Sequence, residues 1–269
     1  MHPRLRLLLI RHGESEANLR EPQYIAGRSA ESALTTRGEQ QARRLGQRLA
    51  HMVKAATESK PIADDTSQHR PPHLHPTVFA SPLKRAQQTA AIVISALPQS
   101  PSVHTVDALA EIFQGEWEDA PREQVLTPET LQALAKNPFE FHAPGGESPR
   151  DVERRASGAL HTLVQQVLAH GAAPDAAPTT EASDVLVLVF THGFVIKCLL
   201  RNILDAAPAM TARIRVDNAA VVELWLQPHH AIATDAGVLA ESAHRLGDWY
   251  LVRVNDALAT YDSAALNAW

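Results

Sequence analysis

The sequence predicts an α/β protein in which a mostly parallel sheet lies between two layers of helices. Short apolar runs alternate with amphipathic helical stretches along the chain, and strands joined by helices build parallel sheets that are covered on both faces. Two of the apolar runs end alike: residues 5–10 lead into Arg11-His12-Gly13, and residues 185–190 lead into Thr191-His192-Gly193. A glycine turn after a strand lies at the carboxyl edge of the sheet, where open α/β folds bind ligands.

The remaining elements follow from apolar periodicity and from capping residues. Further strands are predicted at residues 77–80, 103–106 and 219–226, and helices at residues 14–19, 148–169 and 194–204. Another helix is expected to begin at Thr36, which as N-cap would form a capping box with Glu39. Ser81-Pro82 is expected to start the helix that follows the strand at residues 77–80, with proline in its favoured first position.

We expect one domain over residues 1–269, with surface insertions near residues 55–76 and 171–183. Both stretches are polar, Ala- or Pro-rich and poor in large apolar residues, which is typical of loops that pack no core. His69, His73 and His75 in the first stretch are interpreted as solvated loop residues, because no cysteine or carboxylate lies near them at metal-ligand spacing. The sequence therefore predicts no metal site and no cofactor.

Composition limits the class of partner and the compartment. The formal net charge of −5 over 269 residues gives no general attraction to nucleic acid or to anionic membranes. The single cysteine, Cys198, excludes an internal disulfide and fits a reducing compartment. The start of the chain lacks the apolar region of a signal peptide, and no later segment approaches the ~18 apolar residues of a membrane helix. A cytoplasmic protein without nucleic-acid or membrane partners is expected.

The residues after the first strand predict an anion site. Gly13 lets the backbone turn sharply, and the amides at the following helix start, together with the planar fork of Arg11, suit phosphate oxygens. Nearby positive charge disfavours the imidazolium form of His12, and a neutral imidazole is a competent nucleophile toward phosphorus. A lone histidine after a strand is usually an ordinary loop residue. Here two strands each lead into a histidine and a glycine turn, and Arg11 adjoins the first histidine, which together favour a pocket.

The run Arg11-His12-Gly13-Glu14 resembles the signature of the histidine phosphatase superfamily, in the branch related to cofactor-dependent phosphoglycerate mutase. Further blocks stand in the family's order, which makes chance a poor explanation. They are residues 34–42 (LTTRGEQQA), 81–90 (SPLKRAQQTA), 111–118 (EIFQGEWE), 144–148 (PGGES) and 191–193 (THG). The resemblance implies a phosphoglycerate mutase-like three-layer α/β/α fold.

The resemblance also implies roles for individual residues. His12 would be the phosphorylated nucleophile, Arg11 and Arg85 would clamp the phosphoryl oxygens, and His192 would bind one oxygen from the opposite side. Glu111 would act as general acid and then as general base, although Glu116 and Glu118 lie close by. The remaining phosphate-site residues are expected to be Asn18, Ala26, Gly27 and Gly193, of which Ala26 replaces a polar side chain often found in the family.

The leading hypothesis is a metal-independent phosphatase acting on a small phosphorylated substrate. Mutases of the family carry a long insertion after the general acid, and here the segment from Trp117 to Pro144 is shorter and lacks the expected basic, aromatic pattern. A more open pocket would admit water to the phosphohistidine and favour hydrolysis. Mutase-type phosphoryl transfer and a non-catalytic protein that binds phosphorylated ligands or proteins are the alternatives. The oligomeric state is left open, with a homodimer as one candidate.

Overall fold

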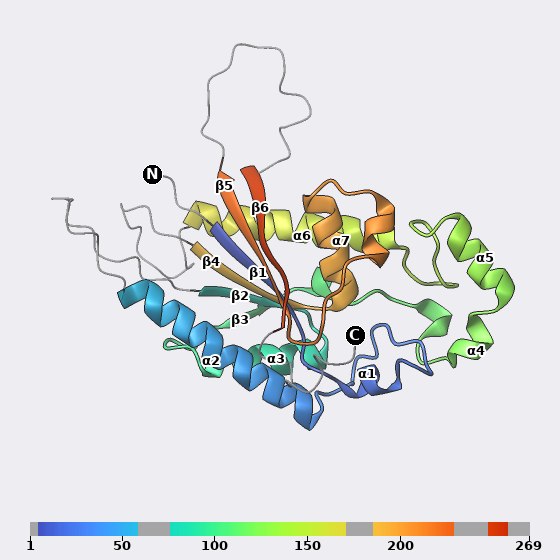
Figure 1. The fold of residues 1–269 in the computed structure, drawn as a ribbon, viewed down its shortest axis with the longest axis horizontal. Helices are drawn as coiled ribbons and strands as arrows, with labels where there is room; N and C mark the ends of the chain where they lie inside the picture. The colour runs from blue at the N-terminus through green and yellow to red at the C-terminus, as the bar shows by residue number, and fades with distance from the viewer. Residues whose placement is uncertain (1–4, 59–75, 171–184, 229–246, 258–269) are drawn as a thin grey trace, which may run out of the picture.

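The computed structural model describes residues 5–58, 76–170, 185–228 and 247–257. Their strands form a six-stranded sheet in the order β3-β2-β4-β1-β5-β6 (Figure 1). Neighbouring strands from β3 to β1 are parallel, whereas β5 is antiparallel to β1 and β6 is antiparallel to β5. The strands are β1 (Leu5–Arg11), β2 (Pro76–Ala80), β3 (Val103–Thr105), β4 (Val185–Thr191), β5 (Val221–Pro228) and β6 (Gly247–Asp256).

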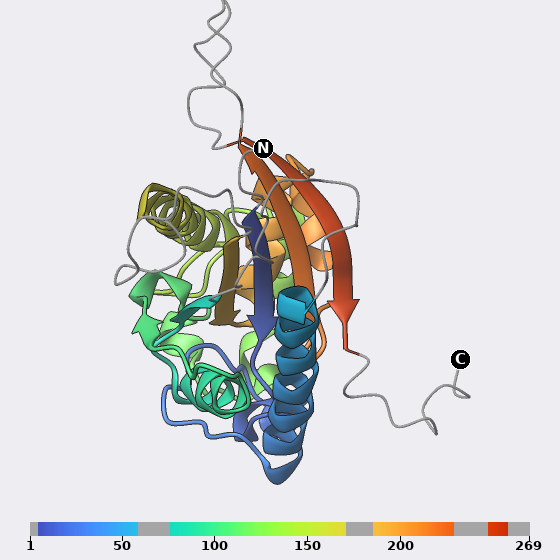
Figure 2. The same ribbon diagram turned by 90° about the vertical axis from the view of Figure 1, so that its left-hand side faces the viewer.

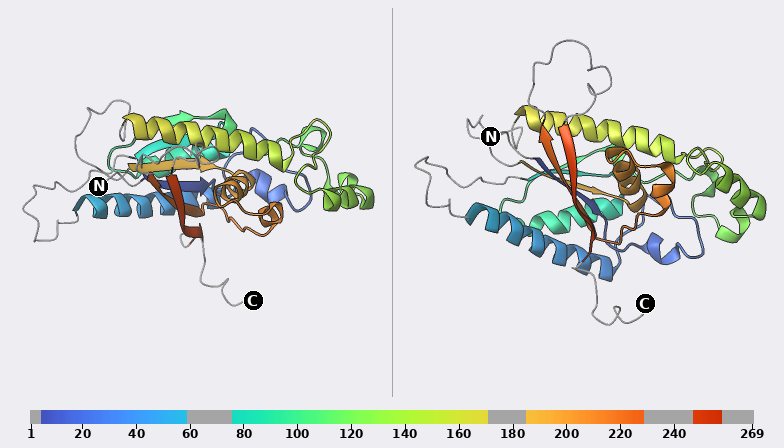
Figure 3. Two further views of the ribbon diagram at one scale, coloured as in Figure 1. Left: turned by 90° about the horizontal axis from the view of Figure 1, so that it is seen from above. Right: turned by 45° about the horizontal axis from the view of Figure 1, so that its top comes forward.

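Helices cover both faces of the sheet, which confirms the predicted three-layer α/β/α class. On one face lie α2 (Thr36–Glu58) and α3 (Lys84–Ser95), and on the other lie α6 (Pro149–His170) and α7 (Gly193–Ile203). Figure 3 shows α2 and α6 on opposite sides of the sheet, and Figure 2 shows β6 at one edge of the twisted sheet.

Side-chain alternation along the central strands creates the two halves of the core. Leu7 and Leu9 of β1 pack in the cluster with α6 and α7, whereas Leu8 and Ile10 pack in the cluster with α2 and α3. Every residue of β4 is buried. A strand covered on both faces reads as a continuous apolar run rather than as an alternating one, which is why residues 5–10 and 185–190 stood out in the sequence.

The pairing of β1 with β4 brings the two histidine turns together. These strands run parallel in register from Leu5 opposite Val185 to Arg11 opposite Thr191. The His12 N–H then donates to the Thr191 carbonyl oxygen over 3.0 Å. Both glycine turns therefore leave the sheet side by side at its carboxyl edge.

Shorter elements surround this edge. They include α1 (Glu16–Arg20), α4 (Arg122–Val125), α5 (Pro128–Lys136) and the 3-10 helices η1 (Asp107–Leu109), η2 (Gly115–Trp117) and η3 (Pro208–Ala212). In Figure 1, α4 and α5 lie beyond the carboxyl end of the sheet. Among the described residues, no helix has the length and apolar character needed to cross a bilayer.

Two predicted helix N-caps are wrong. The α2 helix begins at Thr36, and it is Thr35 whose hydroxyl oxygen accepts a hydrogen bond from the Gly38 N–H over 3.0 Å. The α3 helix begins at Lys84 rather than at Pro82, because the Ser81 hydroxyl oxygen accepts from the Leu83 N–H and holds those residues in a preceding turn. Caps depend on single backbone angles, which local patterns locate only within a residue or two.

Other boundaries also differ from the prediction. Residues 55–58 continue α2 and Pro76 begins β2, so the first predicted insertion is shorter than expected. The rest of that insertion, with His69, His73 and His75, lies outside the described residues, as does the second predicted insertion. The sequence analysis did not predict β6, and its strand at residues 219–226 is found at Val221–Pro228.

Two helical glycines provide a test of the close packing beside the first turn. A Cβ at Gly38 would overlap the Glu14 carbonyl oxygen, whereas a Cβ at Gly158 of α6 would meet nothing within 4 Å. We expect Gly38→Ala to lower the free energy of unfolding by about 1–3 kcal/mol. The matched change Gly158→Ala should raise it by roughly 0.5–1 kcal/mol, because alanine favours the helix. Urea denaturation measures both, and equal stabilisation by the two changes would contradict the packing described.

Candidate active site

A cavity of about 820 Å³ opens at the carboxyl edge of the sheet, beside both histidine turns. The predicted site residues come from several distant segments, yet all of them except His192 line this cavity. Those lining it are Arg11, His12, Asn18, Ala26, Gly27, Arg85, Glu111 and Gly193. His192 is fully buried directly behind it, with its ring centroid 5.1 Å from that of His12.

The His12 side chain is held in one tautomer. Its Nδ1 lies 2.7 Å from the Gly13 carbonyl oxygen, which can only accept a hydrogen bond, so Nδ1 carries the proton. The Nε2 atom is then unprotonated, and its lone pair accepts a hydrogen bond from the Arg85 Nε–H over 3.3 Å. Burial lowers the pKa of His12 well below its usual range, and the positive charges of Arg85 and Arg11 lower it further. The ring is therefore neutral and oriented.

The two arginines are held mainly by backbone carbonyl groups. Arg85 donates through Nη1 to the Arg28 oxygen (2.8 Å) and through Nη2 to the Gly27 oxygen (2.9 Å). Arg11 donates through Nη1 to the Val216 oxygen over 2.7 Å, and its buried Nε has no partner among the described residues. Desolvation lowers the pKa of both guanidinium groups below its usual range, and nearby Glu111 opposes the shift. Carbonyl groups orient the positive charge without neutralising it.

His192 approaches the same point from the end of β4. Its Nε2 lies 2.7 Å from the Ser81 hydroxyl oxygen, and its buried Nδ1 has no partner within the described ranges. Burial lowers the pKa of His192 well below its usual range, with a further contribution from Arg85. A buried ring nitrogen without a partner is costly unless a ligand meets it.

Glu111 is the buried carboxyl group of the site. Its Oε1 accepts from the Ile112 N–H (2.9 Å) and its Oε2 from the Phe194 N–H (3.3 Å). Burial raises the pKa of Glu111, while these backbone contacts and the charges of Arg85 and Arg11 oppose the rise. A carboxyl group with a raised pKa can carry a proton near neutral pH, as a general acid must.

Glu118, the neighbouring candidate acid, has a different environment. Its Oε1 accepts from the N–H groups of Arg28 and Gln114, both over 2.9 Å, and its Oε2 accepts from the Ser29 N–H over 3.1 Å. The carboxylate thus anchors the loop at residues 27–29. Gly27 adopts φ +133°, and a Cβ there would overlap the Glu118 side chain. Glu118 holds the loop whose carbonyl groups orient Arg85.

Asn18 and Gly27 line the cavity with their groups already engaged. The Asn18 Oδ1 accepts from the Asn218 Nδ2 over 3.0 Å, and its own Nδ2 lies 3.4 Å from the Glu21 Oε2. The Gly27 carbonyl oxygen is bound to Arg85. Gly193 has a steric role, because a Cβ there would lie 3.2 Å from the Arg11 Nε.

The comparison with family models decides the affiliation. The model described as "Histidine phosphatase superfamily (branch 1)" matches residues 7–60 and 63–235. The chain belongs to this superfamily.

Relatives and solved structures agree with this assignment over most of the chain. The protein named "Probable phosphoglycerate mutase GpmB" from Yersinia enterocolitica is 29% identical over 242 residues, which cover 89% of this chain and 92% of that protein. Mycobacterial glucosyl-3-phosphoglycerate phosphatase has a similar fold, with a TM-score of 0.64 and 21% identity over 94% of this chain and 99% of that one. Phosphoserine phosphatase from Entamoeba histolytica, solved with 3-phosphoglyceric acid, has a TM-score of 0.63 and 22% identity over 96% and 100% of the two chains.

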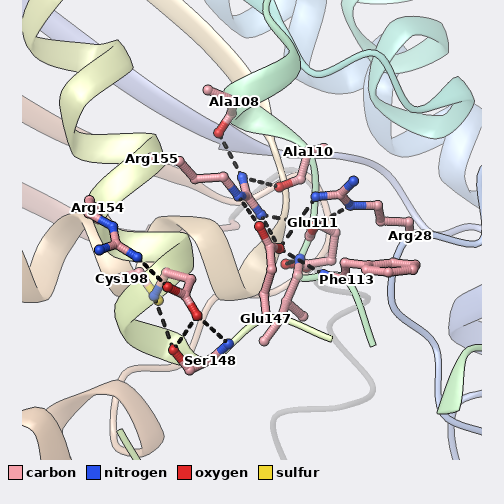
Figure 4. A network of polar contacts seen from close by, with 12 residues as sticks. Arg28, Ala108, Ala110, Glu111, Phe113, Glu147, Ser148, Arg154, Arg155 and Cys198 are labelled. Carbon is pink, nitrogen blue, oxygen red and sulfur yellow. Dashed lines mark hydrogen bonds and ion pairs between the residues drawn. The ribbon is translucent and has the colours of Figure 1, made fainter. Parts of the chain in front are cut away.

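Several residues that support the site of this histidine phosphatase superfamily member were not predicted. Thr89 accepts from the Gly13 N–H over 3.0 Å through its hydroxyl oxygen, and Ser81 contacts His192. Arg28, Glu147 and Arg155 hold the segment around Glu111 (Figure 4). In the sequence, only the PGGES block pointed to any of these three residues. From the sequence alone, an arginine of an amphipathic helix that binds a neighbouring loop cannot be told from one that is exposed to solvent.

The segment after Trp117 forms α4 and α5, and its residues Leu126, Leu134, Phe139 and Phe141 line the cavity. Within the described ranges, no group of three or more His, Cys, Asp or Glu side chains could hold a metal ion. Burial raises the pKa of Cys198 to about 12, so this thiol is unreactive.

The protonation state of His12 can be measured directly. We expect His12 to remain neutral at pH ~5.5, with its proton on Nδ1, because burial and two guanidinium groups disfavour the imidazolium. A solvated imidazole with a pKa of about 6.5 is mostly protonated at that pH. Side-chain ¹⁵N chemical shifts from a pH titration report both properties, and His12→Asn assigns the signals. A His12 signal that titrates near pH 6.5 would contradict the described environment.

Proposed function

We propose that the protein is a phosphatase that hydrolyses a small phosphate monoester through a phosphohistidine on His12, without needing a metal ion. The observation that carries this proposal is the neutral His12 ring, whose Nε2 lone pair lies beside the Arg85 guanidinium in a cavity shared with Arg11 and Glu111. Membership of the superfamily supports the reaction class.

In the first step, Nε2 of His12 attacks phosphorus, the P–N bond forms and the P–O ester bond breaks. Negative charge spreads over the equatorial oxygens of the transferring group. Arg11, Arg85 and His192 lie where they can bind those oxygens, and the buried Nε of Arg11 and Nδ1 of His192 lack other partners in the described structure. Protonated Glu111 donates its proton to the departing oxygen, so the alcohol leaves neutral.

In the second step, a water molecule attacks the phosphorus of the phosphohistidine. Glu111, now a carboxylate, accepts a proton from that water as the P–O bond forms and the P–N bond breaks. Phosphate leaves, and both His12 and Glu111 return to their starting states. The positive charge comes from arginines that are oriented before the reaction begins, which is the usual source of transition-state stabilisation in such sites.

Hydrolysis is favoured over mutase-type transfer by the outer wall of the cavity. A mutase must hold a second acceptor hydroxyl and a strongly anionic intermediate, whereas this wall is formed largely by apolar side chains. The chain resembles a protein named as a probable phosphoglycerate mutase and also solved structures named as phosphatases. Release of phosphate to water, rather than its return to a second hydroxyl of the product, separates the two activities.

A phosphorylated small molecule is thus the proposed partner, in line with the phosphorylated compounds named for the phosphatases of similar fold. A cytoplasmic location and a single domain remain predictions from the sequence, and a homodimer remains one candidate for the oligomeric state.

His12→Ala tests the proposal. We expect it to lower kcat by about 10⁴-fold or more, because the nucleophile cannot be replaced by the remaining groups. In the parent protein, acid-labile phosphate on His12 should be trapped by rapid quenching and located by mass spectrometry. His104→Ala, which changes an exposed histidine of β3, serves as the matched control. Near-normal hydrolysis by the His12→Ala protein would end the proposal.

A further inference from the structure

The cavity extends beyond the groups that the reaction uses. We call this part the outer chamber, and it is the region lined by Trp117, Leu126, Leu134, Phe139 and Phe141. It lies between η2, α4, α5 and the loop that follows α5. Because the chamber is continuous with the site of His12 and Glu111, a molecule whose phosphate reaches His12 places its alcohol portion there.

Aromatic rings in the chamber are held by their neighbours. The Trp117 and Phe141 rings lie 5.9 Å apart at 43°. Phe139 lies under two guanidinium groups, with Arg150 at 4.9 Å and Arg201 at 4.3 Å from its centroid. Leu126 and Leu134 remain only half-buried. Apolar side chains that meet in a concave wall and stay partly exposed are typical of surfaces that a ligand covers.

Cations other than Arg11 and Arg85 also line the cavity. Arg122 donates to the Glu21 carbonyl oxygen over 2.7 Å, and Arg213 is exposed. Lys197 is half-buried, and any of these three cations could meet a second anionic group of a ligand. An alcohol portion that carries a second anionic group is therefore the main alternative to an apolar one as the occupant of the chamber.

We propose that the outer chamber selects phosphate monoesters of apolar alcohols. This inference rests on the proposed phosphatase activity. At about 820 Å³, the cavity falls within the range of pockets that enclose drug-sized ligands. Such a pocket is larger than a three-carbon phosphate requires.

A series of straight-chain alkyl phosphates tests this selection, because ethyl, butyl, hexyl and octyl alcohols are leaving groups of nearly equal reactivity. We expect kcat/KM to rise about fourfold for each added CH₂ until the chamber is filled. The double change Leu126→Ala with Leu134→Ala should flatten the series, because it removes apolar wall that the longer chains would contact. Leu131→Ala is the matched control, since Leu131 lies on α5 but is 49% exposed and does not line the cavity.

Each outcome is decisive. A flat series with measurable hydrolysis of ethyl phosphate overturns the chamber's role and leaves the phosphatase proposal standing. A preference for 3-phosphoglycerate over hexyl phosphate also overturns it, in favour of an anionic leaving group, and Lys197→Ala shows whether Lys197 is the cation that binds that group. If no ester is hydrolysed, the phosphatase proposal fails, and calorimetric binding of ethyl- and hexylphosphonate then tests the chamber alone.

A separate set of contacts supports a second inference. Arg28, Glu147 and Arg155, which we call the Glu111 clamp, surround the backbone of the segment that carries the proposed acid (Figure 4). Arg155 forms an ion pair with Glu147 in which Nε lies 2.7 Å from Oε1 and Nη2 lies 2.9 Å from Oε2. Both side chains are about 80% buried, with exposed fractions of 19% and 20%.

The clamp forms hydrogen bonds with several backbone groups of this segment. Arg155 donates through Nη1 to the oxygens of Ala108 (2.7 Å) and Ala110 (2.8 Å), and through Nη2 to the Glu111 oxygen (3.1 Å). Glu147 accepts from the Phe113 N–H through Oε2 over 2.9 Å, and its own N–H donates to the Phe113 oxygen over 2.8 Å.

Arg28 connects the clamp to the phosphate-binding side of the site. Its Nε donates to the Glu111 carbonyl oxygen over 3.2 Å, and its Nη2 lies 3.4 Å from the Glu147 Oε2. Its backbone oxygen accepts from the Arg85 Nη1 over 2.8 Å. Arg28 therefore contacts both the peptide group of Glu111 and the side chain of Arg85. These two contacts help to set the distance between the proposed acid and the proposed phosphate-binding arginine.

We infer that Arg155 and Glu147 are positioning residues for proton transfer from Glu111, an inference that rests on the proposed mechanism. Removing one member of a largely buried pair leaves the other charge without its partner, so the segment that it binds must shift. Small misplacements of a reacting group are costly, since a shift of about 1 Å can lower a rate by about 10²-fold.

The dependence of rate on the leaving group tests this role. The 4-nitrophenolate ion leaves without a proton, whereas an alkoxide does not. We expect Arg155→Lys and Glu147→Gln each to lower kcat/KM for ethyl phosphate by about 10–100-fold and to change kcat/KM for 4-nitrophenyl phosphate by less than about threefold. We compare kcat/KM because it reports the steps up to release of the alcohol, and not the later attack of water in which Glu111 acts as the base. Arg154→Lys is the matched control, because Arg154 is the next residue of α6 and its side chain is 74% exposed.

Glu111→Gln provides the reference pattern. If it lowers kcat/KM for both esters equally, the assignment of Glu111 as general acid is wrong. If it is selective for ethyl phosphate but the two clamp variants depress both esters alike, the clamp supports only the fold, and the positioning inference is overturned. A melting temperature measured for each variant shows whether the protein remains folded during the assay.

Discussion

Parallel pairing between β1 and β4 is the interaction on which the remaining structure depends. Both strands are apolar and covered on both faces, and they place Arg11 opposite Thr191. A slip of one residue would exchange the side chains that face α2 with those that face α6. It would also separate the turn at His12 from the turn at His192. The hydrophobic requirement for one register therefore determines the geometry of the site.

The site holds several charged groups away from solvent, and hydrogen bonds to backbone groups offset much of the free energy of desolvation. Carbonyl groups from the loop at residues 27–29 meet Arg85, the Val216 oxygen meets Arg11, and N–H groups meet Glu111. Direct carboxylate partners would have neutralised the arginines and competed with a phosphate. Dipoles that are already oriented need no reorganisation when charge develops in a reaction. The same surroundings disfavour the charged imidazoles, because burial and the guanidinium groups act in one direction on both histidines.

Three glutamates near one another differ in environment and therefore in chemistry. Glu111 is buried against few donors and gains a raised pKa, Glu118 is saturated by backbone N–H groups, and Glu147 is paired with Arg155. Residue type alone does not assign their roles, because each role follows from what the carboxyl group contacts. Relatives named as a mutase and as phosphatases resemble this chain. Differences between such proteins are then expected in the cavity wall rather than around the nucleophile.

The sequence by itself determined the fold class, the superfamily and the two strand–histidine turns, because continuous apolar runs and glycine turns are local signals. It did not predict β6, an edge strand in which charged Arg253 interrupts the apolar residues that follow Asp248. Single-residue caps also escaped it, as at Thr35. Only the tertiary structure separated Glu111 from Glu118 and brought Ser81, Arg28 and Arg155 to the site. Their partners are backbone atoms of distant loops, and no local pattern records which peptide group a side chain will meet once the chain has folded.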